Sequence, residues 1–296
     1  MKVLVTGCNG QLGHEMRNIL EKEMPGKTIY TDIKELDLTD GDAVKSFVEK
    51  NEITHIVNCA AYTAVDRAEE DKALCHQINV DAVRNLANAA SATGAKVVHI
   101  STDYVFDGKA YRPYSESDKV NPMSHYGTTK RQGETALIAL APDSVIVRTA
   151  WLYSPYGNNF VKTMIRLGRE RKELRVVVDQ IGSPTYAADL AAAVYKIIES
   201  HQWVPGIYHF TNSGVASWYD FTKAIHRIAG VTDCKVIPIP TEDYPTAASR
   251  PFYSVLNTHR LRTTYNVEIP YWVDSLEKCI ARLKDCLLYT SPSPRD

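Results

Sequence analysis

The fold is decided by the stretch Val3-Leu4-Val5-Thr6-Gly7-Cys8-Asn9-Gly10-Gln11-Leu12-Gly13. Its apolar start predicts a buried strand, and the three glycines that follow are spaced G-x-x-G-x-x-G. Glycine lets the chain turn tightly and brings main-chain N–H groups close to a pyrophosphate at the start of a helix. We therefore expect a dinucleotide site here rather than a plain strand-to-helix turn. Its expected cofactor contacts are Gly7, Gly10, Gln11, Leu12 and Gly13.

The rest of the first half alternates strand-like and helix-like segments. Runs of β-branched residues predict strands at 3–6, 28–31, 55–58, 96–101 and 145–148. Longer periodic segments predict helices at 11–23, 40–50, 71–93 and 126–140. This alternation is typical of parallel strands joined by crossover helices. We expect an α/β fold with a Rossmann-type, doubly wound parallel sheet.

The second half is irregular and rich in proline, with helical patterns at 186–200 and 218–229. We expect residues 1–150 to form an NAD(P)-binding Rossmann domain. Residues 151–285 are expected to form mainly a smaller C-terminal substrate-binding lobe, with some segments returning to the first domain. Residues 286–296 lose the helical period and resemble a translated transposase adapter used in preparing sequencing libraries. We expect this tail to be non-native and unable to continue the helix before it.

Composition narrows the function classes. The chain has 34 Lys+Arg against 35 Asp+Glu, so charge gives no basis for binding nucleic acid or an anionic membrane. Its apolar runs fall far short of the ~20 residues that cross a bilayer. A strand begins just after Met1, without a secretory cleavage site, which predicts a cytoplasmic protein. The chain holds no C-x-x-C or H-x-x-x-H pair, and Glu15 is expected on a solvated face, so we expect no metal site.

A carboxylate is placed to select the cofactor. Asp32 ends the second predicted strand nineteen residues after Gly13, close to the ~20 at which an acidic group meets the adenosine ribose. Its charge repels a 2′-phosphate, which favours NADH, but Lys34 can offset that repulsion and leaves NADPH open. Asp32 could also simply cap the strand. Ala61, Tyr62 and Thr63 follow the third predicted strand and are expected beside the nicotinamide ribose.

Tyr126 and Lys130 lie four residues apart on one face of a predicted helix. The ammonium group is expected to lower the pKa of the phenol, which suits the proton donor of a carbonyl reduction. Thr102 directly follows the fourth predicted strand, at the sheet edge where α/β proteins carry their sites. We expect Thr102 to polarise the substrate, Tyr126 to act as general acid, and Lys130 to hold the ribose. The same Tyr-x-x-x-Lys spacing recurs at Tyr30 and Tyr219, where we read it as accidental.

Taken together, the motifs resemble those of the dTDP-4-dehydrorhamnose reductases, which belong to the extended short-chain dehydrogenase/reductase superfamily. The resemblance covers residues 1–285, and the glycine spacing is typical of that superfamily. The other matching motifs lie at 63–69, 101–106, 126–130, 148–151, 157–160, 182–185 and 248–251.

The resemblance implies a reductase that uses NADH or NADPH to reduce the 4-keto group of dTDP-6-deoxy-L-lyxo-4-hexulose, giving dTDP-L-rhamnose. It implies adenine contacts from Asp37 and Leu38. It also implies sugar contacts from Thr102, Asp103 and Trp151, with Tyr104 nearby, and a diphosphate contact from Arg250. Trp151 could instead be a core residue, and Arg250 a surface ion pair. A homodimer is compatible with the sequence, although nothing in it fixes the oligomeric state.

Four other functions are weighed against this one. Nucleotide-sugar 4,6-dehydratases carry an acidic residue after the Thr-Asp pair, where this chain has Tyr104. Another nucleotide-sugar 4-ketoreductase or an epimerase stays open, because these enzymes share Tyr126 and Lys130. A non-catalytic NAD(P)-binding regulatory subunit also stays open. The complete set of Thr102, Tyr126 and Lys130 favours an enzyme.

Overall fold

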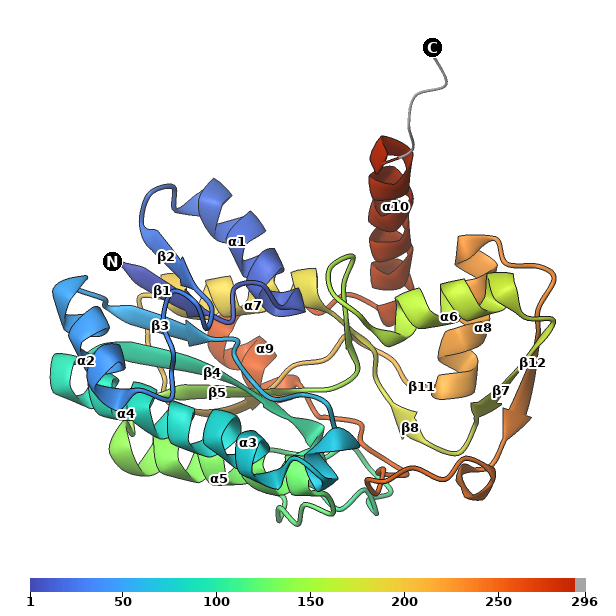
Figure 1. The fold of residues 1–296 in the computed structure, drawn as a ribbon, viewed down its shortest axis with the longest axis horizontal. Coiled ribbons are helices and arrows are strands. Elements are labelled where there is room, and N and C mark those ends of the chain that lie inside the picture. Colours follow the sequence, from blue (N-terminus) through green and yellow to red (C-terminus); the bar gives the residue numbers. More distant parts are fainter. Residues whose placement is uncertain (291–296) are drawn as a thin grey trace.

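The computed structural model describes the backbone of residues 1–290 and the side chains of residues 1–284. Its main feature is a six-stranded parallel sheet in the order β2-β1-β3-β4-β5-β10 (Figure 1). This confirms the predicted α/β fold with a parallel sheet. The strands are β1 (Val3–Thr6), β2 (Thr28–Thr31), β3 (His55–Asn58), β4 (Lys96–Thr102), β5 (Val145–Thr149) and β10 (Gly206–His209).

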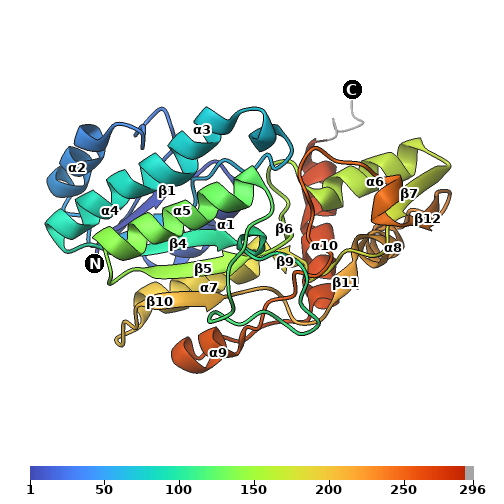
Figure 2. The same cartoon turned by 90° about the horizontal axis from the view of Figure 1, so that it is seen from below.

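Helices cover both faces of this sheet (Figures 1 and 2). Along β1, Val3 and Val5 pack in one apolar cluster, and Leu4 packs in another. A strand buried on both faces has a continuous apolar sequence, as Val3-Leu4-Val5 has in β1. The first face is covered by α1 (Gln11–Glu23), α7 (Ala187–Glu199) and α9 (His259–Tyr265). The second is covered by α2 (Gly41–Lys50), α4 (Ala82–Thr93) and α5 (His125–Leu140).

The predicted helix at 71–93 is interrupted in the structure. It consists of α3 (Lys72–His76), a π-helical segment (Gln77–Asp81) and α4. A π-helical turn inserts an extra residue into the helical period and often occurs at functional sites. Here it buries the polar side chain of Asn79 completely.

A smaller lobe lies beyond the sheet, to the right in Figure 1. Its core includes Tyr153, Val161, Phe221, Ile225 and Leu276. The helices are α6 (Phe160–Glu170), α8 (Trp218–Ala229) and α10 (Trp272–Thr290). The paired strands are β6 (Leu152–Tyr153) with β9 (Thr185–Tyr186), β7 (Glu173–Val177) with β12 (Lys235–Ile239), and β8 (Ile181–Gly182) with β11 (Ala216–Ser217). Short 3₁₀ turns occur at Arg67–Glu69, Asp103–Val105 and Thr241–Asp243.

Three elements of the second half belong to the layers of the large sheet. β10 pairs with β5, α7 packs on α1, and α9 lies against β10. The division of the chain at residues 150 and 285 stays a prediction. The expectation that the tail cannot continue the preceding helix is wrong for residues 286–290, because α10 runs to Thr290. Residues 291–296 lie outside the described part.

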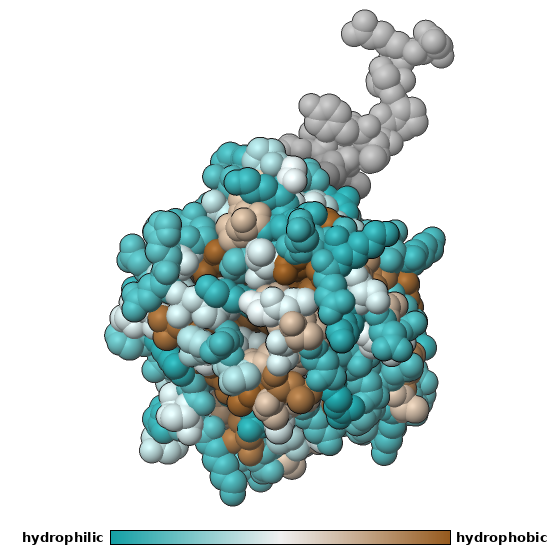
Figure 3. Space-filling model, turned by 90° about the vertical axis from the view of Figure 1, so that its left-hand side faces the viewer, coloured by the Kyte–Doolittle hydropathy of each residue, from teal (hydrophilic) through white to brown (hydrophobic). Residues whose placement is uncertain are grey.

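The face shown in Figure 3 carries mainly hydrophilic side chains, with hydrophobic residues in small, separate groups. Within the described residues, the structure contains no helix that is both long and apolar enough to span a bilayer.

Candidate active site

The glycine turn between β1 and α1 has the geometry that the sequence predicted. Gly7 has a φ of +63°, and a Cβ there would lie 2.7 Å from the main-chain nitrogen of Ala60. A Cβ on Gly13 would overlap the carbonyl oxygen of Gly7. That oxygen accepts a hydrogen bond from the N–H of Gly10 at 3.0 Å. The turn therefore requires glycine, and it directs the free N–H groups at the start of α1 toward one site.

A cavity of about 320 Å³ opens at the carboxyl ends of β1, β2 and β3. The order of strands reverses between β1 and β3, which is where open α/β sheets bind dinucleotides. The residues present fit a dinucleotide, because the glycine turn leaves open a cradle that a side chain would fill. Of the predicted cofactor contacts, the cavity is lined by Gly7, Gly10, Asp32, Asp37, Leu38 and Ala61. The remaining predicted contacts, which are Gln11, Leu12, Gly13, Tyr62, Thr63, Tyr126 and Lys130, lie outside this lining.

Two carboxylates stand on the β2 side of this cavity. Asp32 Oδ2 accepts a hydrogen bond from the main-chain N–H of Asn9 at 3.1 Å, which ties β2 to the glycine turn. Asp37 Oδ1 accepts bonds from the N–H and hydroxyl of Thr39 at 2.9 and 2.7 Å. These bonds hold the pKa of Asp37 below its usual range. Asp37 is therefore a fixed negative charge at the cavity wall.

Asn79 is a residue that the sequence did not single out. Its Oδ1 accepts from the N–H of Tyr62 at 2.9 Å, and its Nδ2 donates to the carbonyl of Tyr62 at 3.1 Å. Nδ2 also lies 3.2 Å from the hydroxyl of Thr129, next to Lys130. Asn79 thus holds the loop after β3 against α5. Thr63, in the same loop, is exposed. The only sequence signal was one polar residue at a core position of a predicted helix.

The three predicted catalytic residues lie together where β4 ends and α5 begins. The hydroxyl of Ser124 caps α5 by accepting from the N–H of Gly127 at 3.1 Å. A Cβ on Gly127 would overlap the carbonyl oxygen of Tyr104, so glycine lets α5 approach the turn after β4. This packing buries Thr102, Tyr126 and Lys130, whose exposed fractions are 5%, 8% and 2%.

The structure corrects the expected pKa of Tyr126. Burial raises the pKa of this phenol, and the nearby Thr102 hydroxyl acts in the opposite direction. The ammonium group of Lys130 donates to the carbonyl of Ile100 at 2.7 Å. Burial also lowers the pKa of Lys130 to about 8. Tyr126 is therefore a neutral phenol, which is the form that can donate a proton.

Tyr104 connects the phenol of Tyr126 to a cation. The two tyrosine rings meet edge to face, with centroids 5.5 Å apart. The Tyr104 hydroxyl accepts from Arg250 Nη1 at 3.0 Å, and Arg250 Nη2 pairs with Asp66 Oδ2 at 2.5 Å. Next to Tyr104, Asp103 accepts from the Thr102 hydroxyl at 3.0 Å, and burial raises its pKa to about 6. Four of the predicted substrate residues, Thr102, Asp103, Tyr104 and Arg250, are thereby brought together.

A second cavity, of about 680 Å³, begins at Arg250 and Asp66 and extends into the smaller lobe. Its walls include Phe160, Met164 and Leu167 from α6. Apolar and aromatic walls with a few charged groups suit a nucleotide-sized ligand.

Trp151 lies outside the lining of the second cavity. Its indole stacks on that of Trp218, with ring centroids 3.6 Å apart, and packs near Phe221 in the core of the smaller lobe. A Cβ on Gly182 would fall 2.7 Å from the same indole, so glycine makes room for it. Trp218 lines the cavity. Trp151 is therefore packed as a core residue would be, one ring away from the cavity.

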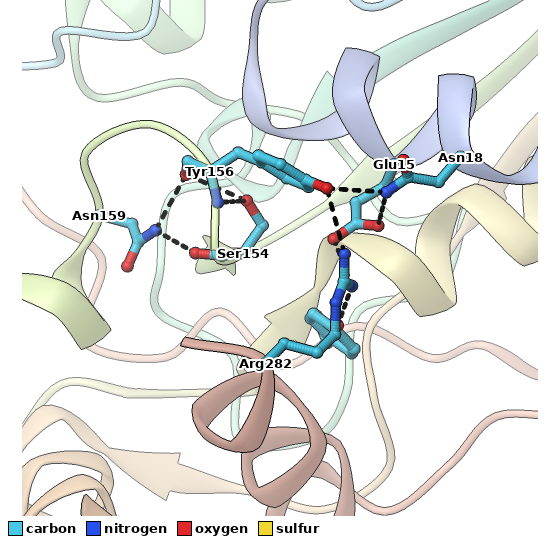
Figure 4. A network of polar contacts seen from close by, with 7 residues as sticks. Glu15, Asn18, Ser154, Tyr156, Asn159 and Arg282 are labelled. Atoms are coloured by element: carbon cyan, nitrogen blue, oxygen red, sulfur yellow. Dashed lines mark hydrogen bonds and ion pairs between the residues drawn. The ribbon is translucent and has the colours of Figure 1, made fainter. Parts of the chain in front are cut away.

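Glu15 corrects another expectation. Its side chain is only 3% exposed, and its Oε1 pairs with Arg282 at 2.8 Å (Figure 4). The partner lies on α10, far away in the sequence, so the local pattern on α1 gave no sign of it. Among the residues that the structure describes, no group of three or more His, Cys, Asp or Glu side chains could hold a metal ion.

The parallel sheet, the glycine turn at the switch point and the Thr102–Tyr126–Lys130 group define the class. They are the features of an extended short-chain dehydrogenase/reductase, with one cavity at the glycine turn and a second that begins at Asp66 and Arg250.

Comparison with known proteins gives the family. The model of the RmlD substrate binding domain matches residues 1–285, and the chain belongs to this family. The dTDP-4-dehydrorhamnose reductase of Aggregatibacter actinomycetemcomitans is 40% identical over 285 residues, which cover 93% of this chain and 97% of that protein.

Solved structures agree with the family assignment. The dTDP-4-dehydrorhamnose reductase of Clostridium acetobutylicum is 48% identical, with a TM-score of 0.92 over 96% of this chain and 100% of the other. The Bacillus anthracis enzyme of that name, solved in complex with NADP, is 43% identical, with a TM-score of 0.91 over 95% of this chain and 100% of the other. The resemblance read from the motifs is confirmed.

Proposed function

We propose that the protein is an NAD(P)H-dependent dTDP-4-dehydrorhamnose reductase, which reduces the C4 keto group of dTDP-6-deoxy-L-lyxo-4-hexulose to give dTDP-L-rhamnose. The observation that carries this proposal is the position of Tyr104. Its ring contacts Tyr126, and its hydroxyl binds Arg250 at the second cavity. A ligand anchored in that cavity therefore has its far end beside a buried proton donor.

The first cavity takes the cofactor, and the reduced nicotinamide supplies the hydride. As C4 gains that hydride, the electron pair of the C=O π bond moves to the oxygen. The Tyr126 hydroxyl donates its proton to this oxygen, and the Thr102 hydroxyl donates a hydrogen bond to it. The Lys130 ammonium group stabilises the negative charge that develops on Tyr126 and holds the ribose of the cofactor.

Arg250 and the second cavity take the diphosphate and the nucleoside. A guanidinium group can bind phosphate oxygens through two parallel bonds. Asp66 and Tyr104 already fix the orientation of Arg250, so little conformational freedom is lost on binding. Asp103 and Tyr104 face the sugar in this arrangement.

The test is loss of reduced-nicotinamide absorbance with dTDP-4-keto-L-rhamnose, generated in place by the preceding pathway enzymes, with NADH and NADPH in separate runs. We expect substrate-dependent oxidation with dTDP-rhamnose as the product. Oxidation with dTDP-4-keto-6-deoxy-D-glucose but not with this substrate would indicate a different 4-ketoreductase, like the relative of that name from Streptomyces niveus. Cofactor binding without any oxidation would favour the regulatory-subunit alternative.

We further propose that the enzyme acts in the cytoplasm, and that it forms a homodimer. The five cysteines whose side chains are described are all free, as a reducing compartment requires. Light scattering on the purified protein measures its mass in solution, and a monomer mass would contradict the dimer.

A further inference from the structure

The loop at 154–159, between β6 and α6, lies next to α1, and Tyr156 points toward Asn18 of that helix (Figure 4). The ring of Tyr156 stacks on His14, with centroids 4.5 Å apart. Its hydroxyl accepts a hydrogen bond from Asn18 Nδ2 at 3.1 Å. A Cβ on Gly157 would lie 3.3 Å from Gln11 Cγ. The smaller lobe therefore rests on the helix whose first turn faces the cofactor site.

Asn159 makes contacts on both sides of this junction. Its Oδ1 caps α6 by accepting from the N–H of Lys162 at 3.1 Å. Its Nδ2 donates to Gln11 Oε1 at 3.0 Å and to the carbonyl of Ser154 at 2.7 Å. One amide thus binds the N-terminus of α6 with its oxygen and the first residue of α1 with its nitrogen.

Each end of this connection leads to a cavity. Gln11 directly follows Gly10, which lines the first cavity, and its own N–H is among those left free at the start of α1. On the other side, α6 carries Phe160, Met164 and Leu167, which line the second cavity. A shift of α6 toward a ligand would therefore move the partner of Gln11 at the glycine turn.

A second tie holds the same loop in place. Arg282 Nη1 pairs with Glu15 of α1 and also bonds the Tyr186 hydroxyl, while its Nη2 lies 3.4 Å from the Tyr156 hydroxyl (Figure 4). The Glu15 carboxylate is buried, whereas the Arg282 side chain is partly exposed. The loop is thus fixed independently of Asn159, and removing the Asn159–Gln11 bond should leave the loop where it is.

We propose that Asn159 is a positioning residue that couples ligand binding in the two cavities through Gln11. A nucleoside diphosphate in the second cavity contacts α6 and fixes its position. Asn159 then holds Gln11 and the glycine turn in the arrangement that binds the pyrophosphate of the cofactor. The coupling is reciprocal, so each ligand tightens the other by the same factor. The identity of the two ligands rests on the proposed function.

The test measures the Kd of NADPH by fluorescence, with and without saturating dTDP. Asn159→Ser keeps a residue that caps helices well but is too short to reach Gln11, so it breaks the connection and spares the cap. It also removes the bond to the Ser154 carbonyl, which Gln11→Ala leaves in place. Gln11→Ala breaks the same bond from the other side. Asn158→Ser changes the exposed neighbour and is the matched control. Asn159→Ala removes both the cap and the connection.

We expect dTDP to tighten NADPH binding in the native protein and in Asn158→Ser. The tightening should shrink by roughly 2- to 10-fold in Asn159→Ser and in Gln11→Ala, the range that one net hydrogen bond supplies. In the double variant Asn159→Ser plus Gln11→Ala, the second change should add nothing to the first. Only Asn159→Ala should also lower the melting temperature.

Full coupling in Asn159→Ser, or losses that add up in the double variant, would overturn the proposal. So would independent binding of the two ligands to the native protein, and that result would leave the proposed function intact. If NADPH or dTDP failed to bind the native protein at all, the proposed function itself would be contradicted.

Discussion

Lys130 and Ile100 are joined by a hydrogen bond of 2.7 Å from the ammonium group to the main-chain carbonyl oxygen. The bond holds the lysine of α5 against the end of β4, in a fully enclosed position. Burial lowers its pKa to about 8, and the nearby Glu134 carboxylate acts in the opposite direction. The charge of Lys130 is therefore poised near neutral pH.

This pKa predicts a basic limb in the pH profile. Turnover should fall as the pH rises through about 8, because Lys130 then loses its proton. Lys130→Arg keeps a positive charge at higher pH and should move that limb upward. The measurement is kcat/KM between about pH 6.5 and 9.5, and an unchanged limb in the variant would assign it to another group.

Stability should change in the opposite direction over part of this range. The folded pKa of Lys130 lies near 8 and the ordinary pKa of lysine is 10.5, so between these pH values the unfolded chain binds more protons. The free energy of unfolding contributed by this group therefore rises with pH in that window. Urea unfolding at pH 8 and pH 10 should show the rise, which should be absent from Lys130→Met.

Tyr126→Phe should lower turnover by roughly 10²–10⁴-fold, because it removes the general acid. Cofactor affinity should change little, since Tyr126 lies outside the lining of the first cavity. Tyr219→Phe is the matched control, since its Tyr-x-x-x-Lys spacing lies on α8. Equal activity in the two variants would remove Tyr126 from the reaction.

Arg250→Gln should raise the KM for the dTDP-sugar by roughly 10- to 100-fold, because it removes charge-assisted bonds to the diphosphate. Arg166→Gln is the control, since Arg166 pairs with Glu170 on the exposed side of α6. Steady-state kinetics with NADPH saturating would separate the two. A normal KM in Arg250→Gln would mean that its contacts with Asp66 and Tyr104 serve the fold alone.

Local pattern was enough to predict the first half of the fold. In β1 and α1 the residue types, the glycine spacing and the helical period all agree, and the predicted bounds match the structure. The helix at 71–93 was predicted without its π-helical segment. In this π-helical segment Asn79 forms hydrogen bonds with Tyr62 and Thr129. Because these are tertiary contacts, the local sequence pattern does not predict them.

The missed parts of the site depend on partners distant in the sequence. Glu15 meets Arg282 at a separation of 267 positions, and Asn159 meets Gln11 at 148. Neither pair has a periodic or spacing signal. Tyr126 and Lys130 could be predicted because one helical turn fixes their relative position. The contact of Lys130 with Ile100 depends on the packing of α5 on β4. The same packing buries both side chains, which raises the pKa of Tyr126 and lowers that of Lys130.

A chain that stops after Asp285 should keep its activity, because the family match ends at that residue. This variant tests the proposal that residues 286–296 are non-native. Turnover and melting temperature would be compared with those of the full chain. A loss of activity together with a lower melting temperature would show that the tail contributes to the fold.

Asp32→Ala should raise the preference for NADPH over NADH. Asp32 lines the first cavity, and its carboxylate is held by the N–H of Asn9 at the place where the adenosine ribose is expected. At this half-exposed position, one negative charge near a 2′-phosphate should weaken NADPH roughly 10-fold, or by about 1.4 kcal/mol. The ratio of kcat/KM for the two cofactors measures the effect, and Asp37→Ala serves as a control at the same cavity wall. Because Asp37 is expected beside the adenine, its loss should weaken both cofactors alike, and an unchanged ratio in Asp32→Ala would assign cofactor choice to other groups around the ribose.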